Sequence, residues 1–446
     1  MRIQTYIFTL ITTLVLIFLN PIVANSAPVA DCKIAAAPFQ TVSLGFPIAS
    51  ERLKGNPKPR ILVLPFRLSD RPTFTFGNEV KNDYLESAKQ IERLSFGKTK
   101  PEFIFHDVID IPETVADMVI LRQNQQQQWQ RDESKSTWGF IRKIIAEHDA
   151  KIDFTGVNAV IFHGSSTSND SWIAEAMMFS KNPRDPWFRP METAEGPILN
   201  ASLLDKRQPI ATITHEIMHL YGLTDLYGSP TGPGNLSLMS NNQDVLLSYE
   251  KWVLDWIPDT QVQCIIEATE INPSNLSTRI TIPNNVADFV TVIKTEKPGT
   301  AYIIETLIYG GVFKFLVFYS LDNEARPPIT LHTPVLGATN SGLLISNLSG
   351  VGTQLISSKY NLLVSDMTSS LITLDLIPKT QLSNASSLIL AAQSNRDRIQ
   401  AEINATNKPD QVNKPVKRKT VVCVKGTSVR KVTAVKPKCP VGFKRR

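Results

Sequence analysis

The sequence lacks long apolar runs beyond its first residues, and it lacks the residue bias of fibrous or disordered chains. Its 446 residues include 21 Gly and 29 Pro, with 42% hydrophobic and 20% charged residues, close to the average of globular proteins. Collagen-like, coiled-coil and wholly disordered chains are therefore excluded. At about 100–200 residues per domain, this length predicts two or three domains.

Acidic residues are missing from the C-terminal end. From Lys414 to Arg446 the sequence has 12 Lys or Arg and no Asp or Glu, which leaves 35 basic against 41 acidic residues before it. The body is mildly acidic, so we expect no nucleic acid partner. We expect the basic tail to hold the protein near an anionic cell envelope. The alternative is a basic end that has no partner.

The N-terminus is typical of a secretory signal peptide, predicted here as residues 1–26. Arg2 precedes an apolar run from Tyr6 to Leu19, too short to span a bilayer comfortably, and the small residues Ala24-Asn25-Ser26 follow. An uncleaved anchor is the alternative. A lipid anchor at Cys32 is disfavoured, because an aspartate precedes this cysteine. We therefore expect a secreted or extracellular protein, with cell-surface association through the tail.

Cysteine is scarce, and the four residues present favour two disulfides in an exported chain. Cys423 and Cys439 share a short tail segment, which leaves Cys32 to pair with Cys264. The alternative is that Cys32 is an inhibitory metal ligand in a prosegment, which would leave Cys264 without a partner.

Strands and helices alternate in the first half of the chain, which predicts an α/β domain over residues 57–262. Gln123 to Gln130 has no apolar period and is expected to be a loop. The expected strands are Arg60–Phe66, Phe103–Ile111 and Asn158–His163, and the expected helices are Asn78–Phe96 and Trp138–His148.

The second half is rich in β-branched and aromatic runs separated by turn residues, which predicts a β-rich, sandwich-like domain over residues 264–380. A helix and a linker are expected over 385–415, and a small disulfide-closed hairpin module over 416–446. The β-like runs are Thr278–Ile282, Phe289–Lys294, Ala301–Tyr309 and Val312–Tyr319 in this domain, and Val421–Val424 and Val429–Val435 in the module.

Histidine is also scarce, yet two of the six histidines stand one helical turn apart. His215 and His219 would lie on one face of a helix that begins near Pro209, so both rings can reach one metal ion. Gly222 permits the backbone geometry that ends the helix, and the turn can bring Asp225 to the metal.

Two histidines, one carboxylate and one open position suit a single catalytic zinc ion. Bound zinc lowers the pKa of water to about 7. Glu216, next to the first histidine, would then accept the water proton and pass it to the leaving amine.

The segment from His215 to Tyr227 resembles the zinc site of the immune inhibitor A family of secreted metallopeptidases, metzincin-like enzymes with Asp as third ligand. The resemblance covers roughly Pro57 to Ile257. It implies a metzincin-like fold for the α/β domain and proteins or peptides as substrates. Weaker matches to the family are Ile61–Asp70, Leu94–Lys98, Ser237–Ser240 and Leu247–Ile257.

The resemblance also implies that Met239 packs beneath the metal in a tight turn. Asn241 stands where many metzincins have a tyrosine that stabilises the oxyanion. Tyr221, Tyr227 and Tyr249 are candidate substitutes, and the sequence does not select among them.

The remaining candidates have simpler interpretations. We expect His106, His148, His163 and His332 to be core or surface residues rather than ligands. Asp149 and Asp153 could contribute to a structural Ca²⁺ site, although no recognisable ligand loop is present.

The predicted function is therefore a secreted zinc-dependent endopeptidase. One alternative is a non-catalytic cell-surface binding protein on a peptidase scaffold, which would have no need of Glu216. A second alternative is a hydrolase that acts on bonds other than peptides.

Overall fold

The computed structural model describes residues 27–38, 40–127, 136–167, 173–180, 189–241, 244–309, 313–332, 343–344, 351–406 and 419–446. The predicted signal peptide and most of the predicted linker lie outside the described residues. The chain is of mixed α/β class, and it forms two compact units that divide between Arg396 and Asp397. No helix in the described part of the chain is long and apolar enough to cross a membrane.

The first sheet has the strand order β2-β1-β4-β6-β5, with β3 beside β1. Strands β1, β2, β4 and β6 are parallel, and β5 is antiparallel at the edge. The central strands are continuous apolar runs because both faces of a parallel sheet are covered. The strands are β1 (Arg60–Arg67), β2 (Glu102–Phe105), β3 (Ile109–Asp110), β4 (Ala159–His163), β5 (Ala174–Met178) and β6 (Asn200–Leu204).

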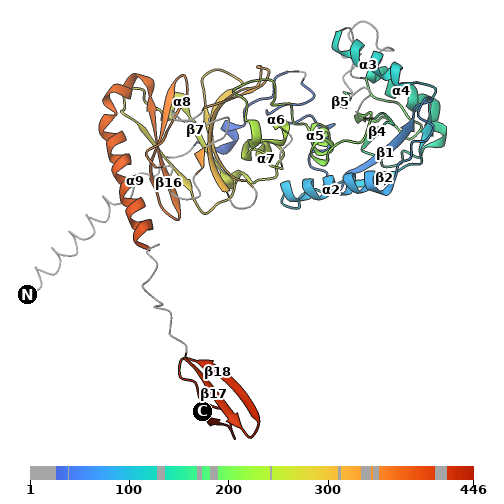
Figure 1. Cartoon of the computed structure of the whole chain (residues 1–446). Helices are drawn as coiled ribbons and strands as arrows, with labels where there is room; N and C mark the ends of the chain where they lie inside the picture. The colour runs from blue at the N-terminus through green and yellow to red at the C-terminus, as the bar shows by residue number, and fades with distance from the viewer. Residues whose placement is uncertain are drawn as a thin grey trace, which may run out of the picture. The chain divides into compact units, whose positions relative to one another are not determined.

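Helices pack on both faces of this sheet. Helix α5 contacts β5, β6 and helix α2, which also contacts β2 (Figure 1). The helices of this half are α2 (Asn78–Leu94), α3 (Val115–Gln127), α4 (Thr137–His148), α5 (Ile210–Tyr221), α6 (Leu238–Asn241) and α7 (Ser248–Val253).

Two expectations for this half need correction. Residues 123–127 are not a loop but the last turn of α3, because glutamine is a good helix former even on a fully polar surface. The expected strand Phe103–Ile111 is two strands, β2 and β3, separated by residues 106–108. Residues 128–130 of the expected loop lie outside the described residues.

The β-rich half contains two sheets. One has the order β12-β11-β10-β9-β7 with β13 beside β11, and the other has the order β14-β15-β16-β8. The strands are β7 (Val262–Ile266), β8 (Thr278–Pro283), β9 (Phe289–Lys294), β10 (Thr300–Tyr309), β11 (Phe313–Asp322), β12 (Ile329–Leu331), β13 (Leu343–Leu344), β14 (Gln354–Ile356), β15 (Tyr360–Met367) and β16 (Leu371–Pro378), with helices α8 (Glu267–Glu270) and α9 (Ser386–Thr406).

Residues 27–56 form a strap that precedes the expected start of the α/β domain. The strap contributes apolar residues to a core that continues through α5 and α7 into strands β9 to β11. Cys32 in the strap is bonded to Cys264 on β7, 232 residues away. This confirms the predicted disulfide, and a half-cystine cannot also be a metal ligand, so the inhibitory-ligand alternative for Cys32 is wrong for the folded chain.

The C-terminal module is a three-stranded antiparallel sheet with the order β18-β17-β19. Its strands are β17 (Lys419–Lys425), β18 (Ser428–Ala434) and β19 (Lys444–Arg445), and Figure 1 shows the hairpin of β17 and β18. The predicted Cys423–Cys439 disulfide is present. The bridge closes a short loop in a module that has little apolar core, and it stabilises the module mainly by restricting the unfolded chain.

Candidate metal centre

Helix α5 positions the two histidines and Glu216. Every residue from Thr212 to Tyr221 is buried, so this helix lies inside the molecule rather than on its surface. Thr214 on α5 is hydrogen-bonded to Gln90 of α2 at 2.6 Å. The helix therefore packs between α2 and the edge strand β5. This packing fixes the direction in which the side chains of His215 and His219 point.

Gly222 ends the helix and turns the chain toward the histidines. Its φ is 113°, in the left-handed region, and a Cβ here would lie 2.4 Å from Cγ2 of Ile48 in the strap. Ser43 and Leu53 of the strap donate backbone hydrogen bonds to the carbonyls of Gly222 and Leu220, at 2.9 and 2.8 Å. The last carbonyls of α5 are thus satisfied by the strap.

The turn brings Asp225 to both histidines. Oδ1 of Asp225 lies 3.1 Å from Nε2 of His215 and 3.1 Å from Nε2 of His219. One ligand atom from each of the three residues lies within 4.8 Å of the other two. The structure therefore brings together all three predicted metal ligands.

The tautomers of the two rings follow from their backbone partners. Nδ1 of His215 lies 3.0 Å from the carbonyl oxygen of Leu238, and Nδ1 of His219 lies 2.8 Å from that of Leu223. A carbonyl can only accept, so each Nδ1 carries the proton and each neutral ring presents the Nε2 lone pair. Two lone pairs and a carboxylate oxygen converge, and such a donor set fits a cation. Nitrogen and oxygen donors of this kind suit zinc.

The segment with Met239 contacts both His215 and the loop that carries Asp225. Leu238, which receives the hydrogen bond of His215, and the fully buried Met239 begin helix α6. The carbonyl of Met239 accepts the backbone N–H of Leu226, the residue after Asp225, at 2.9 Å. This turn therefore holds one histidine and the aspartate loop through backbone atoms. Backbone carbonyls have no sequence signature, and the sequence analysis did not identify them.

The carboxyl group of Glu216 is almost fully buried, with 6% of the residue exposed. Burial raises its pKa to about 8, the charges of Asp225 and Glu175 act in the same direction, and a backbone hydrogen bond from Ala176 opposes them. Ala176 lies on the edge strand β5, so the candidate base lies between the metal ligands and this strand. Strand β5 is a second feature that the sequence analysis missed, because its residues lack β-branched side chains.

The three candidate tyrosines have different environments. The hydroxyl of Tyr221 is buried and bonded to Thr99 at 2.7 Å, and that of Tyr249 is buried without a partner among the described residues. Tyr227 is 56% exposed, and its ring stacks on that of His215 with centroids 6.0 Å apart. Its pKa is raised, first by burial and then by Asp225, to which its hydroxyl is hydrogen-bonded. Tyr227 is the one candidate of these three that borders the metal ligands.

The remaining sequence candidates lie apart from this cluster. The carboxylate of Asp149 accepts the backbone N–H of Ala194, and that of Asp153 accepts the N–H of Thr155. Neither belongs to a group of three potential ligands among the described residues. The other four histidines also lie outside such a group there, and they are His106, His148, His163 and His332.

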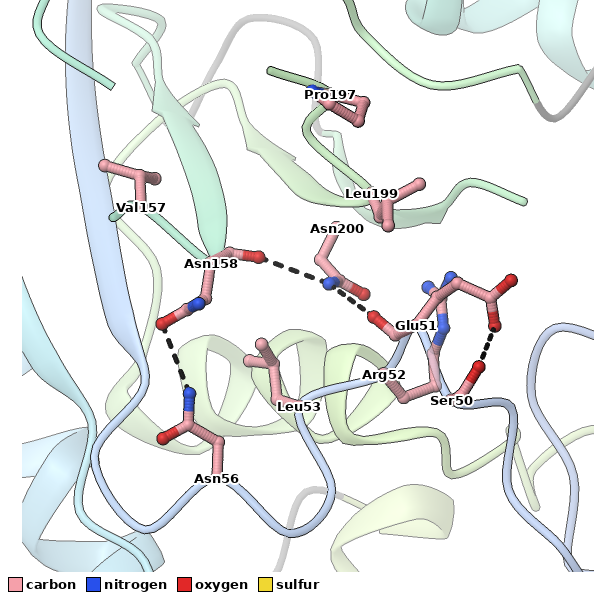
Figure 2. A pocket seen from close by; sticks show the side chains of 10 residues that line it. All are labelled: Ser50, Glu51, Arg52, Leu53, Asn56, Val157, Asn158, Pro197, Leu199 and Asn200. Carbon is pink, nitrogen blue, oxygen red and sulfur yellow. Dashed lines mark hydrogen bonds between the residues drawn. The ribbon is translucent and has the colours of Figure 1, made fainter. Parts of the chain in front are cut away.

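A cavity of about 320 Å³ lies where the strap meets the first residues of β4 and β6. Figure 2 shows three asparagine side chains on its wall, from Asn56, Asn158 and Asn200. The amide of Asn56 donates to Asn158, and that of Asn200 donates to two backbone carbonyls. The amide nitrogens of Asn56 and Asn200 are used within the chain, but Oδ1 of Asn200 and the Nε and Nη1 atoms of Arg52, which also lines the cavity, are buried without a hydrogen-bond partner among the described residues. No predicted ligand lines the cavity.

Comparison with known proteins leaves the family open. No family model matches the sequence, and no curated protein matches it. The resemblance to the immune inhibitor A family thus remains a prediction that rests on the motif residues.

Proposed function

We propose that the protein is an exported zinc endopeptidase of metzincin-like fold. His215, His219 and Asp225 would hold the ion. The observation that carries this proposal is the convergence of two Nε2 lone pairs and one carboxylate oxygen, with both rings oriented by hydrogen bonds from Nδ1 to backbone carbonyls. Zinc bound there would supply a Lewis acid that activates water near neutral pH.

Glu216 acts as the general base in this proposal. It follows His215 directly on α5, and its raised pKa of about 8 reflects a site from which water is largely excluded. A nearby cation would favour its ionised form. The carboxylate accepts the proton of the attacking water and then delivers it to the leaving amine.

Strand β5 supports a peptide as substrate. It ends the sheet in the order β2-β1-β4-β6-β5, so one side of its backbone has no neighbouring strand among the described residues of this sheet. An extended peptide can add to such an edge through backbone hydrogen bonds. Because Ala176 on β5 is bonded to Glu216, a peptide on this edge would pass the base and the three ligands.

Tyr227 completes the proposed site. Its hydroxyl is hydrogen-bonded to Asp225, and the residue is more than half exposed. It is therefore placed at the open side of the ligands, where it can donate a hydrogen bond to the oxygen that becomes negative during attack on a peptide carbonyl.

The test is proteolysis of a denatured protein substrate by the purified mature chain, with and without a chelator. We expect chelator-sensitive cleavage that zinc restores. Glu216→Gln should keep stoichiometric zinc and lose activity by about 100- to 10,000-fold, because an amide cannot accept the proton. Glu195→Gln, at an exposed position, is the matched control and should keep full activity. Cleavage that survives both the chelator and Glu216→Gln would refute the proposal.

A further inference from the structure

The cavity beside the strap has two buried polar groups on its wall that the described residues do not satisfy. Arg52 is 5% exposed, and its Nη2 donates to the carbonyl of Phe179, while Nε and Nη1 have no acceptor there. Asn200 is 3% exposed, and its Oδ1 has no donor. Burying such groups unpaired is costly, and most so for a charged group. Because both residues line the cavity, a partner for them would enter from the cavity.

The side chain of Arg52 is a cation without a paired carboxylate. Burial lowers its pKa, but only to about 10, and the charge of Glu51 opposes this shift. No ion pair joins Arg52 to a carboxylate among the described residues, and the carboxylate of Glu51 instead accepts a hydrogen bond from Ser50. A partner with one negative charge would therefore suit Arg52, whereas two or three negative charges would be repelled by Glu51.

The amide of Asn200 adds a second requirement. Its Nδ2 donates to the backbone carbonyls of Glu51 and Asn158, at 2.9 and 3.2 Å, and these two bonds fix which atom of the amide is the free acceptor (Figure 2). Acetate and sulfate offer only acceptors and cannot satisfy Oδ1. The partner must therefore carry an N–H or O–H group beside its negative charge. Glu51 directly precedes Arg52, so the two requirements arise at neighbouring positions of the strap.

The cavity limits the size of the partner. Its volume of about 320 Å³ is near the lower end of the range for small-ligand sites, about 300–1,000 Å³. Ser50 and Pro197 in its lining are exposed, so the cavity is open to solvent on that side. Val157 and Leu199 also line it and can contact a small apolar group.

We propose that this cavity binds an α-carboxylate whose α-carbon carries an N–H group, as in the C-terminus of a peptide or a free amino acid. The carboxylate accepts hydrogen bonds from Arg52, and the N–H donates to Oδ1 of Asn200. A charged hydrogen bond of the first kind is stronger than a neutral one. The second bond separates this class of ligand from simple anions.

Such a ligand would join three segments of the fold. Arg52 lies in the strap, Asn200 begins β6, and Phe179 directly follows β5. The side chain of Arg52 also packs near the end of α5, since its Cγ would lie 3.3 Å from a Cβ placed on Gly222. Binding would therefore hold the strap against the sheet and should raise the melting temperature of the main unit.

The experiment titrates the full mature chain with N-acetylglycine, which has one carboxylate and one amide N–H, and follows binding by calorimetry. We expect saturable binding at about 1–10 mM. N-acetylglycinamide lacks the charge and acetate lacks the N–H, so each should bind at least about tenfold more weakly.

Two variants locate the site. Arg52→Gln should weaken binding of N-acetylglycine at least about tenfold, because the amide has no charge to offer the carboxylate. Arg60→Gln, the matched control, removes the same charge from an exposed position that does not line the cavity, and it should bind as the wild type does. Glycine distinguishes the two sources of the ligand. Tighter binding of glycine indicates a free amino acid, and tighter binding of N-acetylglycine indicates a peptide C-terminus.

Several results would overturn the proposal. Equal affinities for N-acetylglycine and acetate, or for the wild type and Arg52→Gln, would remove the assigned contacts. A lack of saturable binding would show that water satisfies these groups. If Arg52→Gln does not fold, the series of analogues on the wild type still decides. Binding that disappears with a chelator would place the carboxylate on a metal ion instead. A chain that binds no zinc should still bind N-acetylglycine, so this test stands apart from that of the zinc site.

Discussion

Single backbone carbonyls orient both histidines of the candidate centre. Because the carbonyls of Leu223 and Leu238 accept from Nδ1, each imidazole is held in the tautomer that presents Nε2 to Asp225. Partners of this kind raise the basicity of a metal-ligating histidine and fix its ring. The three side chains are therefore arranged for a cation before any ion binds.

The first residue-scale prediction concerns metal content. His219→Ala should lose zinc, because two remaining ligands hold the ion too weakly at ordinary trace concentrations. Elemental analysis of the dialysed protein measures the result. His148→Ala is the control, since this half-exposed histidine lies outside the cluster, and it should keep one zinc per chain. Stoichiometric zinc in His219→Ala would contradict the ligand assignment.

The second residue-scale prediction separates Tyr227 from the other tyrosines. Tyr227→Phe keeps the ring against His215 and removes only the hydroxyl, so we expect kcat to fall by about 100-fold with zinc content and KM nearly unchanged. Tyr249→Phe removes a buried hydroxyl that has no described partner, and it should leave kcat unchanged. Equal kcat values for wild type and Tyr227→Phe would remove Tyr227 from the mechanism.

At the scale of elements, the end of helix α5 depends on the strap. The strap packs Ile48 against Gly222 and supplies backbone donors to the last carbonyls of the helix. The loop that carries Asp225 starts at this point, so the strap helps to position this proposed ligand without containing a proposed ligand itself.

Gly222→Ala tests this contact. The new Cβ would clash with Ile48, and the alanine backbone would have to adopt a left-handed φ. We expect a loss of about 3 kcal/mol in the free energy of unfolding, together with weaker zinc binding. Gly228 also has a positive φ, 89°, but a Cβ there would meet nothing within 4 Å. Gly228→Ala should thus cost only about 1 kcal/mol. Equal costs in denaturant titrations would refute the role of the strap.

Helix α7 joins the α/β half to the β-rich half through buried carboxyl groups. Glu305 of β10 accepts the backbone N–H groups of Ser248 and Tyr249, and Lys251 is paired with Asp288 at 2.7 Å. Glu250 accepts from Ser237 and from the N–H of Leu247. Burial raises the pKa of Glu250 to about 8, and these two hydrogen bonds oppose the shift.

This shift predicts a pH dependence of stability. Between pH 4.5, the ordinary pKa of Glu250, and about 8, the folded chain retains a proton that the unfolded chain has released. Stability from this group is therefore complete below pH 4.5 and is lost as the pH rises to about 8. Glu250→Gln cannot titrate, so the stability of the wild type relative to this variant should fall by at least about 1.4 kcal/mol over that window.

Urea titrations at several pH values measure this difference. The exposed Glu324→Gln is the matched control, and its difference from the wild type should stay constant with pH. Parallel pH profiles for the wild type and Glu250→Gln would contradict the assignment.

At the scale of the whole molecule, one apolar core runs from the strap through helix α5 into the β-rich half. The Cys32–Cys264 bridge closes a loop of 232 residues around this core. Long loops lose the most entropy on closure, about 5 kcal/mol in the chain-entropy model. The bridge therefore ties the strap to the rest of the fold.

The prediction is that Cys32→Ser/Cys264→Ser destabilises the main unit by roughly 2–5 kcal/mol and makes the strap sensitive to limited proteolysis. Cys423→Ser/Cys439→Ser, the matched control, should leave the melting of the main unit unchanged, because this bridge lies wholly within the C-terminal module. A native wild-type chain with two free thiols at Cys32 and Cys264 would contradict the structure.

Local sequence patterns alone were enough to predict many of the helices and strands. The sequence correctly predicted the strands β1, β9 and β10 and the helix α2. These elements could be predicted because the periodicity of strands and helices depends on residues that are close together in the sequence. Both disulfide pairings were predicted from the number and position of the cysteines.

The convergence of His215, His219 and Asp225 could also be predicted, because the helical spacing of the two histidines and the glycine turn before Asp225 are local geometry. Only the tertiary structure decided which groups surround these three side chains. The edge strand β5, the carbonyls of Leu223 and Leu238 and the strap contact at Ile48 come from distant segments or from backbone atoms. Contacts with distant segments and contacts through backbone atoms have no recognisable residue pattern in the sequence. Both depend on how the chain packs rather than on which side chains are adjacent in sequence.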